Sequence, residues 1–436
     1  MVERLPSDGA TRRVIAAVSA GCPRRIVVVG MTFLGCVIAY TDRVNISVAA
    51  VAMQDRFAWS QTQKGLVLSA FFVGYLLFMF PAGLLARHLG GKRVLGLAVF
   101  GWSLFTLLTP IAATLSIVAL LAVRIAMGVG EAAMFPATYE LFGRWVPSTE
   151  RGRAVAALIS GVPVGTLIGL MGAGWLVQQH GWPMAFYVFG VVGFIWVLVW
   201  TWQIENDPSA DRHLGAEERV LLSSVSPQAD ATERPPLRRL LLRAPSLAIV
   251  AAHFATTWNL YVLLSWLPSY FRDVHKLSIA GAGLLSAAPW VTSIATSNLI
   301  AVATDRLIHR GANRTTMRKF VQCTALLGTA CLLLLLPQAR STVAALALLC
   351  AAVGALTCFS AGFAAGVLDV APRSAAVLYG FSNTFATVPG IVGVTATGWL
   401  IDLTGTYTAA FTLAAAISAV GALLFGWLFE AREIER

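Results

Sequence analysis

Twelve long apolar segments divide the 436-residue chain and favour a bundle of membrane-spanning helices over any soluble fold. Each segment has about 20 residues or more, the length that a helix needs to cross ~30 Å of hydrocarbon. Only 12% of the residues are charged, whereas a typical soluble domain has roughly 25%. We therefore predict an all-α membrane protein with twelve transmembrane helices. The predicted segments are 26–53, 65–86, 94–113, 115–141, 154–178, 183–203, 246–271, 280–304, 319–337, 341–368, 374–401 and 407–429.

Lysine and arginine are distributed unevenly between the two sides of the predicted membrane. Of the 32 such residues, 25 fall in the termini and one set of alternate loops, 5 fall in the other loops and 2 lie inside segments. Because positive residues accumulate in cytoplasmic loops, we predict a multi-pass protein of the cell (inner) membrane with both termini cytoplasmic. The same bias accounts for the net charge of +11 without nucleic acid as a partner.

A long polar segment from Gln203 to Pro245 separates six apolar segments from the other six. We predict an N-terminal six-helix bundle over residues 1–203, a cytoplasmic linker over 204–245 and a C-terminal six-helix bundle over 246–436. Two bundles of this kind suit a secondary transporter, because alternating access requires two rigid units that rock about a site near the middle of the membrane.

Four charged residues interrupt the apolar segments. Asp42 and Arg43 are adjacent near the middle of the first segment, so their side chains diverge by ~100°. Arg124 and Glu131 lie seven residues apart in the fourth segment, on one helix face and ~10 Å apart along the axis. A charge at the bilayer centre costs from about 2.5 to more than 10 kcal/mol unless a partner, water or a substrate compensates it.

Two interpretations of these four charges remain open from their placement alone. In the structural one, they neutralise each other and stabilise the N-terminal bundle. In the functional one, Arg43 and Arg124 bind an anionic substrate, while Asp42 and Glu131 take up and release protons.

The sequence contains no motif that supports a catalytic function. The six cysteines form no Cys-x-x-Cys and no Cys/His cluster. Gly128 and Gly130 lie within an apolar segment, with no preceding strand and no third glycine at nucleotide-loop spacing. We predict that the protein is no enzyme and needs no metal or cofactor, the proton gradient being its driving force.

Weaker signals come from small and polar residues within the segments. Gly161, Gly165 and Gly169 recur at four-residue spacing in the fifth segment, a pattern that predicts close packing against another helix. Tyr75 and Asn383 are polar groups at membrane depth that are suited to hydrogen bonding with a substrate. Hydrogen bonds between helices explain either residue equally well.

Several longer stretches carry a family resemblance. They are YTDRVNISVA, VRIAMGVGEAAMFPATYELFGRWVPSTERGRAVA, HGWPMAFYVFGVVGFIWVLVWTWQIENDPS, LLSWLPSYFRDV, ATDRLIHRGANRTTMRK and LDVAPRSAAVLYGFSNTFATVPGIVG. Together they resemble the anion:cation symporter family of the major facilitator superfamily, which includes bacterial permeases for hexuronates and sugar acids, plastid phosphate transporters and sialin. The resemblance implies twelve helices in two six-helix bundles and a role in transport.

The resemblance also implies roles for individual residues. Arg43 and Arg124 match the arginines that bind the substrate anion in the sugar-acid permeases, and Asp42 and Glu131 match the proton-coupling acids. Tyr75 and Asn383 resemble polar residues of the cavity. We therefore expect a monomeric proton symporter that imports a small organic anion, such as a hexonate, a hexuronate or another monocarboxylate. The alternative is a proton-antiporting exporter of a drug or metabolite.

Two departures from the family pattern bear on this expectation. The loop after the second segment has Arg87 and His88 where the superfamily usually has an aspartate and a basic residue. In the seventh segment, Thr256 stands where the related glutamate carriers have a basic residue. A site without that basic residue favours a monoanion over a dicarboxylate.

Overall fold

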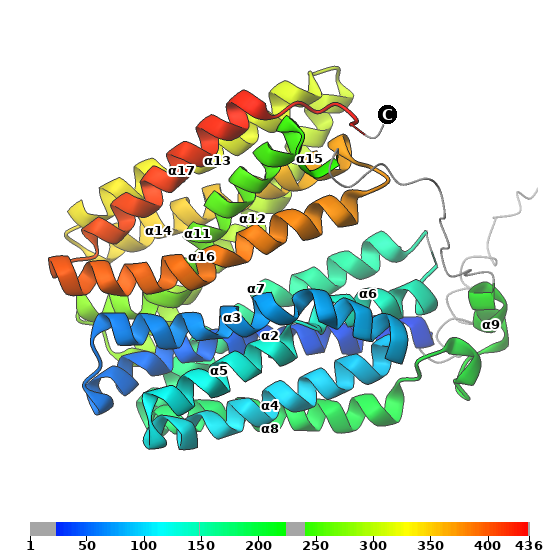
Figure 1. Cartoon of the computed structure of the whole chain (residues 1–436), viewed down its shortest axis with the longest axis horizontal. Helices are drawn as coiled ribbons and strands as arrows, with labels where there is room; N and C mark the ends of the chain where they lie inside the picture. The colour runs from blue at the N-terminus through cyan, green and yellow to red at the C-terminus, as the bar shows by residue number, and fades with distance from the viewer. Residues whose placement is uncertain (1–22, 148, 224–239, 435–436) are drawn as a thin grey trace, which may run out of the picture.

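The computed structural model describes residues 23–147, 149–223 and 240–434. Within these ranges twelve helices are long and apolar enough to cross a membrane, which confirms the predicted fold class (Figure 1). The spans are α2 (Arg24–Phe57), α3 (Gln61–Leu89), α4 (Gly91–Leu115), the pair α5 (Ile117–Glu131) and α6 (Met134–Trp145), α7 (Arg151–His180), α8 (Trp182–Gln203), α11 (Ala244–Asp273), α12 (Ile279–His309), α13 (Arg314–Leu335), the pair α14 (Thr342–Leu356) and α15 (Phe363–Val370), α16 (Ala375–Thr404) and α17 (Thr408–Leu428). Residues 1–22 and 224–239, which include much of the predicted linker, lie outside the described ranges.

Several helices, including the first, extend past the apolar segments that predicted them. The first span runs over Arg24–Phe57, whereas its apolar segment covers 26–53. The fourth span contains a break that its apolar segment did not reveal, because α5 ends at Glu131 and α6 begins at Met134. Pro136 explains the break: it has no N–H to donate to the carbonyl of Ala132, and its ring crowds that carbonyl.

Figure 1 shows the spans gathered into two bundles that touch at one end and diverge toward the other. We call α2–α8 the first bundle and α11–α17 the second. The end that carries the short helix α9 (Ala216–Ser223) is called the linker end, and the opposite end the sealed end. Between the bundles, α3 packs against α16 and α7 packs against α12. The approach of α16 to α3 is so close that a Cβ on Gly398 would lie 2.2 Å from the carbonyl oxygen of Gln61.

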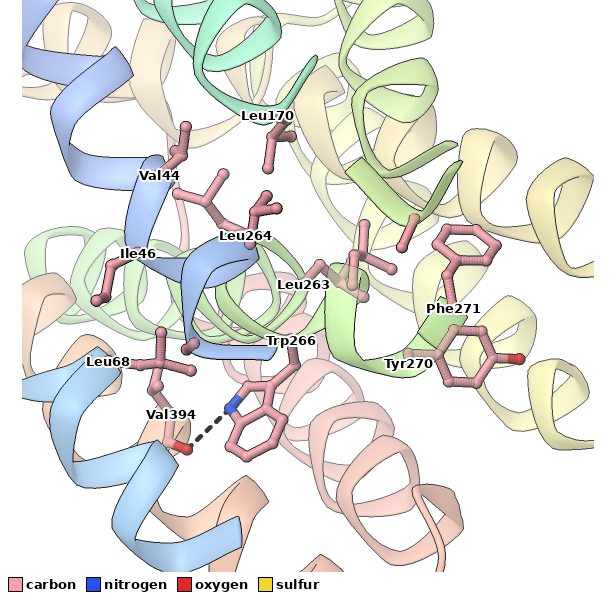
Figure 2. Packing of buried hydrophobic residues seen from close by; sticks show 14 of the residues in the cluster. Val44, Ile46, Leu68, Leu170, Leu263, Leu264, Trp266, Tyr270, Phe271 and Val394 are labelled. Atoms are coloured by element: carbon pink, nitrogen blue, oxygen red, sulfur yellow. Dashed lines mark hydrogen bonds between the residues drawn. The ribbon is translucent and has the colours of Figure 1, made fainter. Parts of the chain in front are cut away.

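An apolar core fills the contact between the bundles. Figure 2 shows Val44, Leu68 and Leu170 of the first bundle packed with Leu264, Trp266 and Val394 of the second. The indole N–H of Trp266 donates to the carbonyl of Val394 at 3.0 Å, so the buried polar atom of this large side chain is satisfied. The core therefore joins the two bundles without leaving the indole nitrogen unpaired.

The start of the first bundle is attached to residues that follow α8. Glu218 of α9 accepts hydrogen bonds from the backbone N–H groups of Arg24 and Arg25, at 2.9 and 3.1 Å. Asp211 accepts a further bond from the Arg24 side chain at 2.9 Å. Glu218 thus satisfies two backbone donors at the N-terminus of α2, and both carboxylates complement the helix dipole there.

The glycine stripe of the fifth span faces the first span, which confirms its predicted role in helix packing. A Cβ on Gly165 would lie 2.3 Å from the carbonyl oxygen of Val37, and Gly161 and Gly169 also border α2. Small side chains let the two helix backbones approach this closely. The packing fixes α2, and with it Asp42 and Arg43, against α7.

Candidate functional site

A buried ion pair joins α2 to the end of α5. The side chains of Arg43 and Glu131 belong to residues that are 7% and 1% exposed. Arg43 Nε donates to Glu131 Oε1 at 2.8 Å, and Arg43 Nη2 donates to the same oxygen. The second carboxylate oxygen of Glu131 is buried without a hydrogen-bond partner among the described residues. Glu131 is therefore the counter-charge of Arg43, and it lies where the fourth span breaks.

Three aromatic rings surround the guanidinium of Arg43. Its central carbon lies 4.5 Å from the ring centroid of Tyr40, 4.8 Å from that of Phe71 and 5.1 Å from that of Tyr75. Rings at this distance attract a cation through their quadrupoles. Tyr40 precedes Arg43 by three residues, and Phe71 and Tyr75 lie four residues apart on α3, so each helix presents its members on one face.

Arg124 of α5 lies nearby but is bound differently. It is 1% exposed, and its Nη1 donates to Met127 Sδ at 3.1 Å. Its central carbon lies 5.6 Å from the ring of Phe71. Its Nε is buried without a hydrogen-bond partner, and no carboxylate in the described part of the chain forms an ion pair with it. Arg124 is thus a buried cation without a contacting counter-ion, an arrangement that is costly in a low-dielectric interior.

A small internal cavity borders both arginines. It has a volume of about 10 Å³ and is lined by Arg43, Arg124 and Phe71 of the first bundle together with Leu264 and Ser265 of the second. A cavity of this size holds at most about one water molecule. The cavity therefore places both cations at the contact between the bundles, with room for solvent but not for an organic anion in this conformation.

Asp42 lies apart from this cavity, as the ~100° divergence from Arg43 predicts. It is fully buried, and within the described ranges neither of its carboxylate oxygens has a hydrogen-bond partner. It borders an apolar groove of about 410 Å³ on the outer face of α2, α7 and α8, beside Phe189 and Trp196. The nearby indole N–H of Trp102 is also buried and unpaired. The structure thus gives the two acids different surroundings: Glu131 contacts an arginine and Asp42 does not.

The crossing of α3 and α5 positions the aromatic rings beside the charges. A Cβ on Gly74 would lie 1.9 Å from the carbonyl oxygen of Ile125, and one on Gly128 would lie 2.0 Å from that of Phe71. Only glycine at both positions permits backbones to meet at this distance. The crossing therefore holds Phe71 and Tyr75 against Arg124 and Glu131.

Asn383 occupies a different part of the contact between the bundles. It lies on α16, and its Nδ2 donates to Met79 Sδ of α3 at 3.1 Å. Met79 is one helical turn from Tyr75, so Asn383 lies near the aromatic rings but does not contact Arg43 through any bond that the structure shows. Of the six residues predicted for the site, the structure brings Arg43, Glu131, Arg124 and Tyr75 together, whereas Asp42 and Asn383 form no hydrogen bond or ion pair with these four.

Sequence reasoning missed three aromatic members of the site. Tyr40 and Phe71 could have been found from helical spacing, because each is one turn from a predicted residue. Tyr261 of α11 carried no such signal. Its ring lies 4.5 Å from that of Phe72 of α3, so it brings an aromatic side chain of the second bundle to the helix that carries Phe71 and Tyr75.

Comparisons with known proteins agree with this architecture. The family described as Major Facilitator Superfamily matches residues 32–394. The chain is 36% identical over 403 residues to the sodium-dependent phosphate transport protein 1, chloroplastic, of Arabidopsis thaliana, covering 92% of this chain and 78% of that protein. It is 35% identical to the chloroplastic ascorbate transporter of the same plant, covering 92% and 74%. It is 32% identical to human sialin, covering 98% and 93%.

Solved structures share the fold at low sequence identity. The xylose transporter XylE from E. coli, in an inward open conformation, has a TM-score of 0.75 at 11% identity and covers 93% of this chain and 96% of its own. A bacterial homologue of the human lysosomal transporter Spinster, inward-facing and occupied, has a TM-score of 0.73 at 18% identity, covering 93% and 95%. The family match over residues 32–394 and the relatives at 32–36% identity, together with the twelve spans, show that the chain belongs to the major facilitator superfamily and is a multi-pass membrane transporter rather than an enzyme.

Proposed function

We propose that the protein is a proton-coupled symporter that takes up a small organic anion, such as a sugar acid or another monocarboxylate. One observation carries the proposal: a buried carboxylate, Glu131, neutralises one of two buried arginines, while the other arginine, Arg124, has no contacting counter-ion. The names of the relatives, which refer to phosphate and ascorbate, support an anionic substrate.

The exchange of partners at Arg43 supplies a mechanism for coupling. While Glu131 is ionised, it occupies Arg43 and competes with a substrate carboxylate for the same donors. A proton on Glu131 removes that competition, so that Arg43 and Arg124 together receive the anion. Binding of one anion therefore favours binding of one proton, because the two together leave the net charge of the buried site unchanged, whereas an anion or a proton alone would change it.

The position of Asp42 suggests a second proton site. No described residue forms a hydrogen bond to the Asp42 carboxylate in this conformation, and an ionised carboxylate is unfavourable in such a buried apolar setting, so we assign the protonated form to Asp42 here. Neutralised in this way, Asp42 adds no negative charge to repel the substrate anion from Arg43 and Arg124. The site then presents two cations to a substrate, with no further basic residue at Thr256 for a second carboxylate.

The distribution of basic residues and the position of the sealed end together support an orientation in the membrane and a direction of transport. Arginine and lysine outside the spans concentrate at the linker end, which we assign to the cytoplasm of the cell (inner) membrane, with both termini on that side. In this orientation the end at which the two bundles diverge faces the cytoplasm, and the sealed end faces the outside. A proton gradient directed inward drives uptake in this orientation, and the protein works as a monomer without a cofactor.

Transport by right-side-out membrane vesicles tests the proposal. Labelled hexonates, hexuronates and other monocarboxylates are offered first under an inward proton gradient, and then under an inward sodium gradient of equal size. Accumulation driven by the proton gradient alone supports the proposal. Accumulation driven only by the sodium gradient would mean that sodium, and not the proton, is the coupling ion. A proton-antiporting exporter would fail to concentrate any of these anions inside such vesicles.

A further inference from the structure

The N-terminus of α3 receives two of its hydrogen bonds from the opposite bundle. Asp402, near the end of α16, accepts from the backbone N–H of Gln61 at 2.9 Å and from that of Thr62 at 2.7 Å. The hydroxyl of Thr62 donates to the same carboxylate at 2.6 Å. The first backbone donors of a helix have no partner within the helix. Asp402 therefore completes an element of the first bundle from the second.

The other donors of this turn are satisfied within α3 itself. Ser60 Oγ accepts from the N–H of Gln63 at 3.1 Å, and the Gln63 side chain accepts from the N–H of Ser60 at 3.0 Å. This capping box leaves the N–H groups of Gln61 and Thr62 without a local acceptor. The local sequence thus caps half of the turn, and the remainder depends on contact with α16.

We propose that Asp402 and the first turn of α3 form a latch that stabilises the sealed conformation relative to the one in which this end is open. A carboxylate at a helix N-terminus gains both charge-assisted hydrogen bonds and a favourable interaction with the helix dipole. When α3 and α16 separate, the carboxylate and both N–H groups exchange these partners for water. The latch lies beside the closest approach of the two helices at Gly398, so the bonds cannot survive opening of that contact.

The latch has a predictable strength. Asp402 is exposed, and exposed charges are screened by water and salt, so its contribution is smaller than that of a buried ion pair. We expect Asp402→Asn to shift the ratio of open to sealed conformations about fivefold toward the open one. Thr62→Val removes only the hydroxyl bond and should shift it less.

Distance measurement between two spin labels tests the latch without any substrate, so that its outcome does not depend on the proposed coupling or substrate. The labels are placed at Arg56→Cys in the first bundle and Thr406→Cys in the second, both exposed at the sealed end, in a chain whose native cysteines have been replaced. Asp402→Asn should enlarge the population with the longer separation. Ser341→Ala is the matched control, because Ser341 Oγ accepts from the N–H of Ala344 at 3.1 Å and so caps a helix at the same end within the second bundle.

Two results would overturn the latch: an unchanged distance distribution in Asp402→Asn, or an equal widening in Asp402→Asn and Ser341→Ala. If Asp402→Asn does not fold, Asp402→Glu takes its place. It retains the charge but displaces the carboxylate oxygens, and it should widen the distribution to a smaller extent. The proposal would also be overturned if Asp402→Glu and Thr62→Val both fold and both give the same distance distribution as the parent protein.

Discussion

Arg43 and Arg124 carry the same charge in the same bundle, but the structure gives them different surroundings. Arg43 is enclosed by Glu131 and three aromatic rings, whereas Arg124 contacts a methionine sulfur and one of those rings. An anion entering the site therefore meets one cation that is already neutralised and one that is not. The two arginines should contribute unequally to binding, and their removal should have different consequences.

Arg124→Ala should weaken substrate binding strongly, because the variant loses the buried cation that lacks a competing carboxylate. We expect affinity to fall roughly 100-fold, in keeping with about 2–3 kcal/mol for a charge-assisted hydrogen bond. The measurement is the ligand-induced rise in unfolding temperature of the purified protein across a panel of organic acids. Arg144→Ala is the control, since Arg144 pairs with Glu140 on the surface of the same span. Equal ligand stabilisation of both variants would exclude Arg124 from the binding site.

Glu131→Gln should retain exchange of substrate across the membrane but lose accumulation under a proton gradient. The amide keeps the size of the side chain, but it can neither release a proton nor neutralise Arg43. Counterflow and gradient-driven uptake are compared in the same proteoliposomes, with Glu140→Gln as the matched control. Normal accumulation by Glu131→Gln would show that another group carries the coupled proton.

At the scale of helices, the sequence predicts where each membrane-spanning helix lies better than it predicts where a helix breaks or how two helices cross. Twelve spans were predictable because each needs a long apolar run, whatever its neighbours are. The break after Glu131 was not, because the apolar run continues through it and Pro136 alone marks the position. Backbone contact between α3 and α5 was also unpredictable, since a glycine in an apolar helix shows only that a close approach is allowed. Gly74 and Gly128 permit the crossing only as a pair, because each one faces the backbone of the other helix.

Gly128→Ala should destabilise the first bundle and loosen the site. The added methyl group would lie 2.0 Å from the Phe71 carbonyl oxygen, so α3 and α5 must separate. Overpacking of this kind costs about 1–3 kcal/mol, and we expect a lower unfolding temperature together with weaker ligand binding. Gly101→Ala is the control, because a Cβ at Gly101 of α4 meets no atom within 4 Å. Identical unfolding temperatures for both variants would contradict the crossing.

At the scale of the whole molecule, the site lies where the two bundles meet, and most of its second-bundle side could not be predicted. The first-bundle members Arg43, Arg124 and Glu131 could be predicted, because a charged side chain inside an apolar segment has a large free-energy cost in the membrane. Tyr261 and the cavity residue Ser265 have ordinary residue types, and only the packing of α11 against α2 brings them to the charges. A change in that packing would change which second-bundle residues line the site, so the lining depends on which end of the molecule is closed.

Gly398→Trp should prevent closure of the sealed end and stop transport without abolishing binding. A Cβ at this position already lies 2.2 Å from the Gln61 carbonyl, and an indole would hold α16 away from α3 while leaving Arg43 and Arg124 untouched. We expect uptake to fall below a tenth of the parent rate, while ligands still raise the unfolding temperature. Gly101→Trp places the same side chain on a helix position without neighbours and should transport normally. Full uptake by Gly398→Trp would mean that the bundles can complete the cycle without bringing α3 and α16 together.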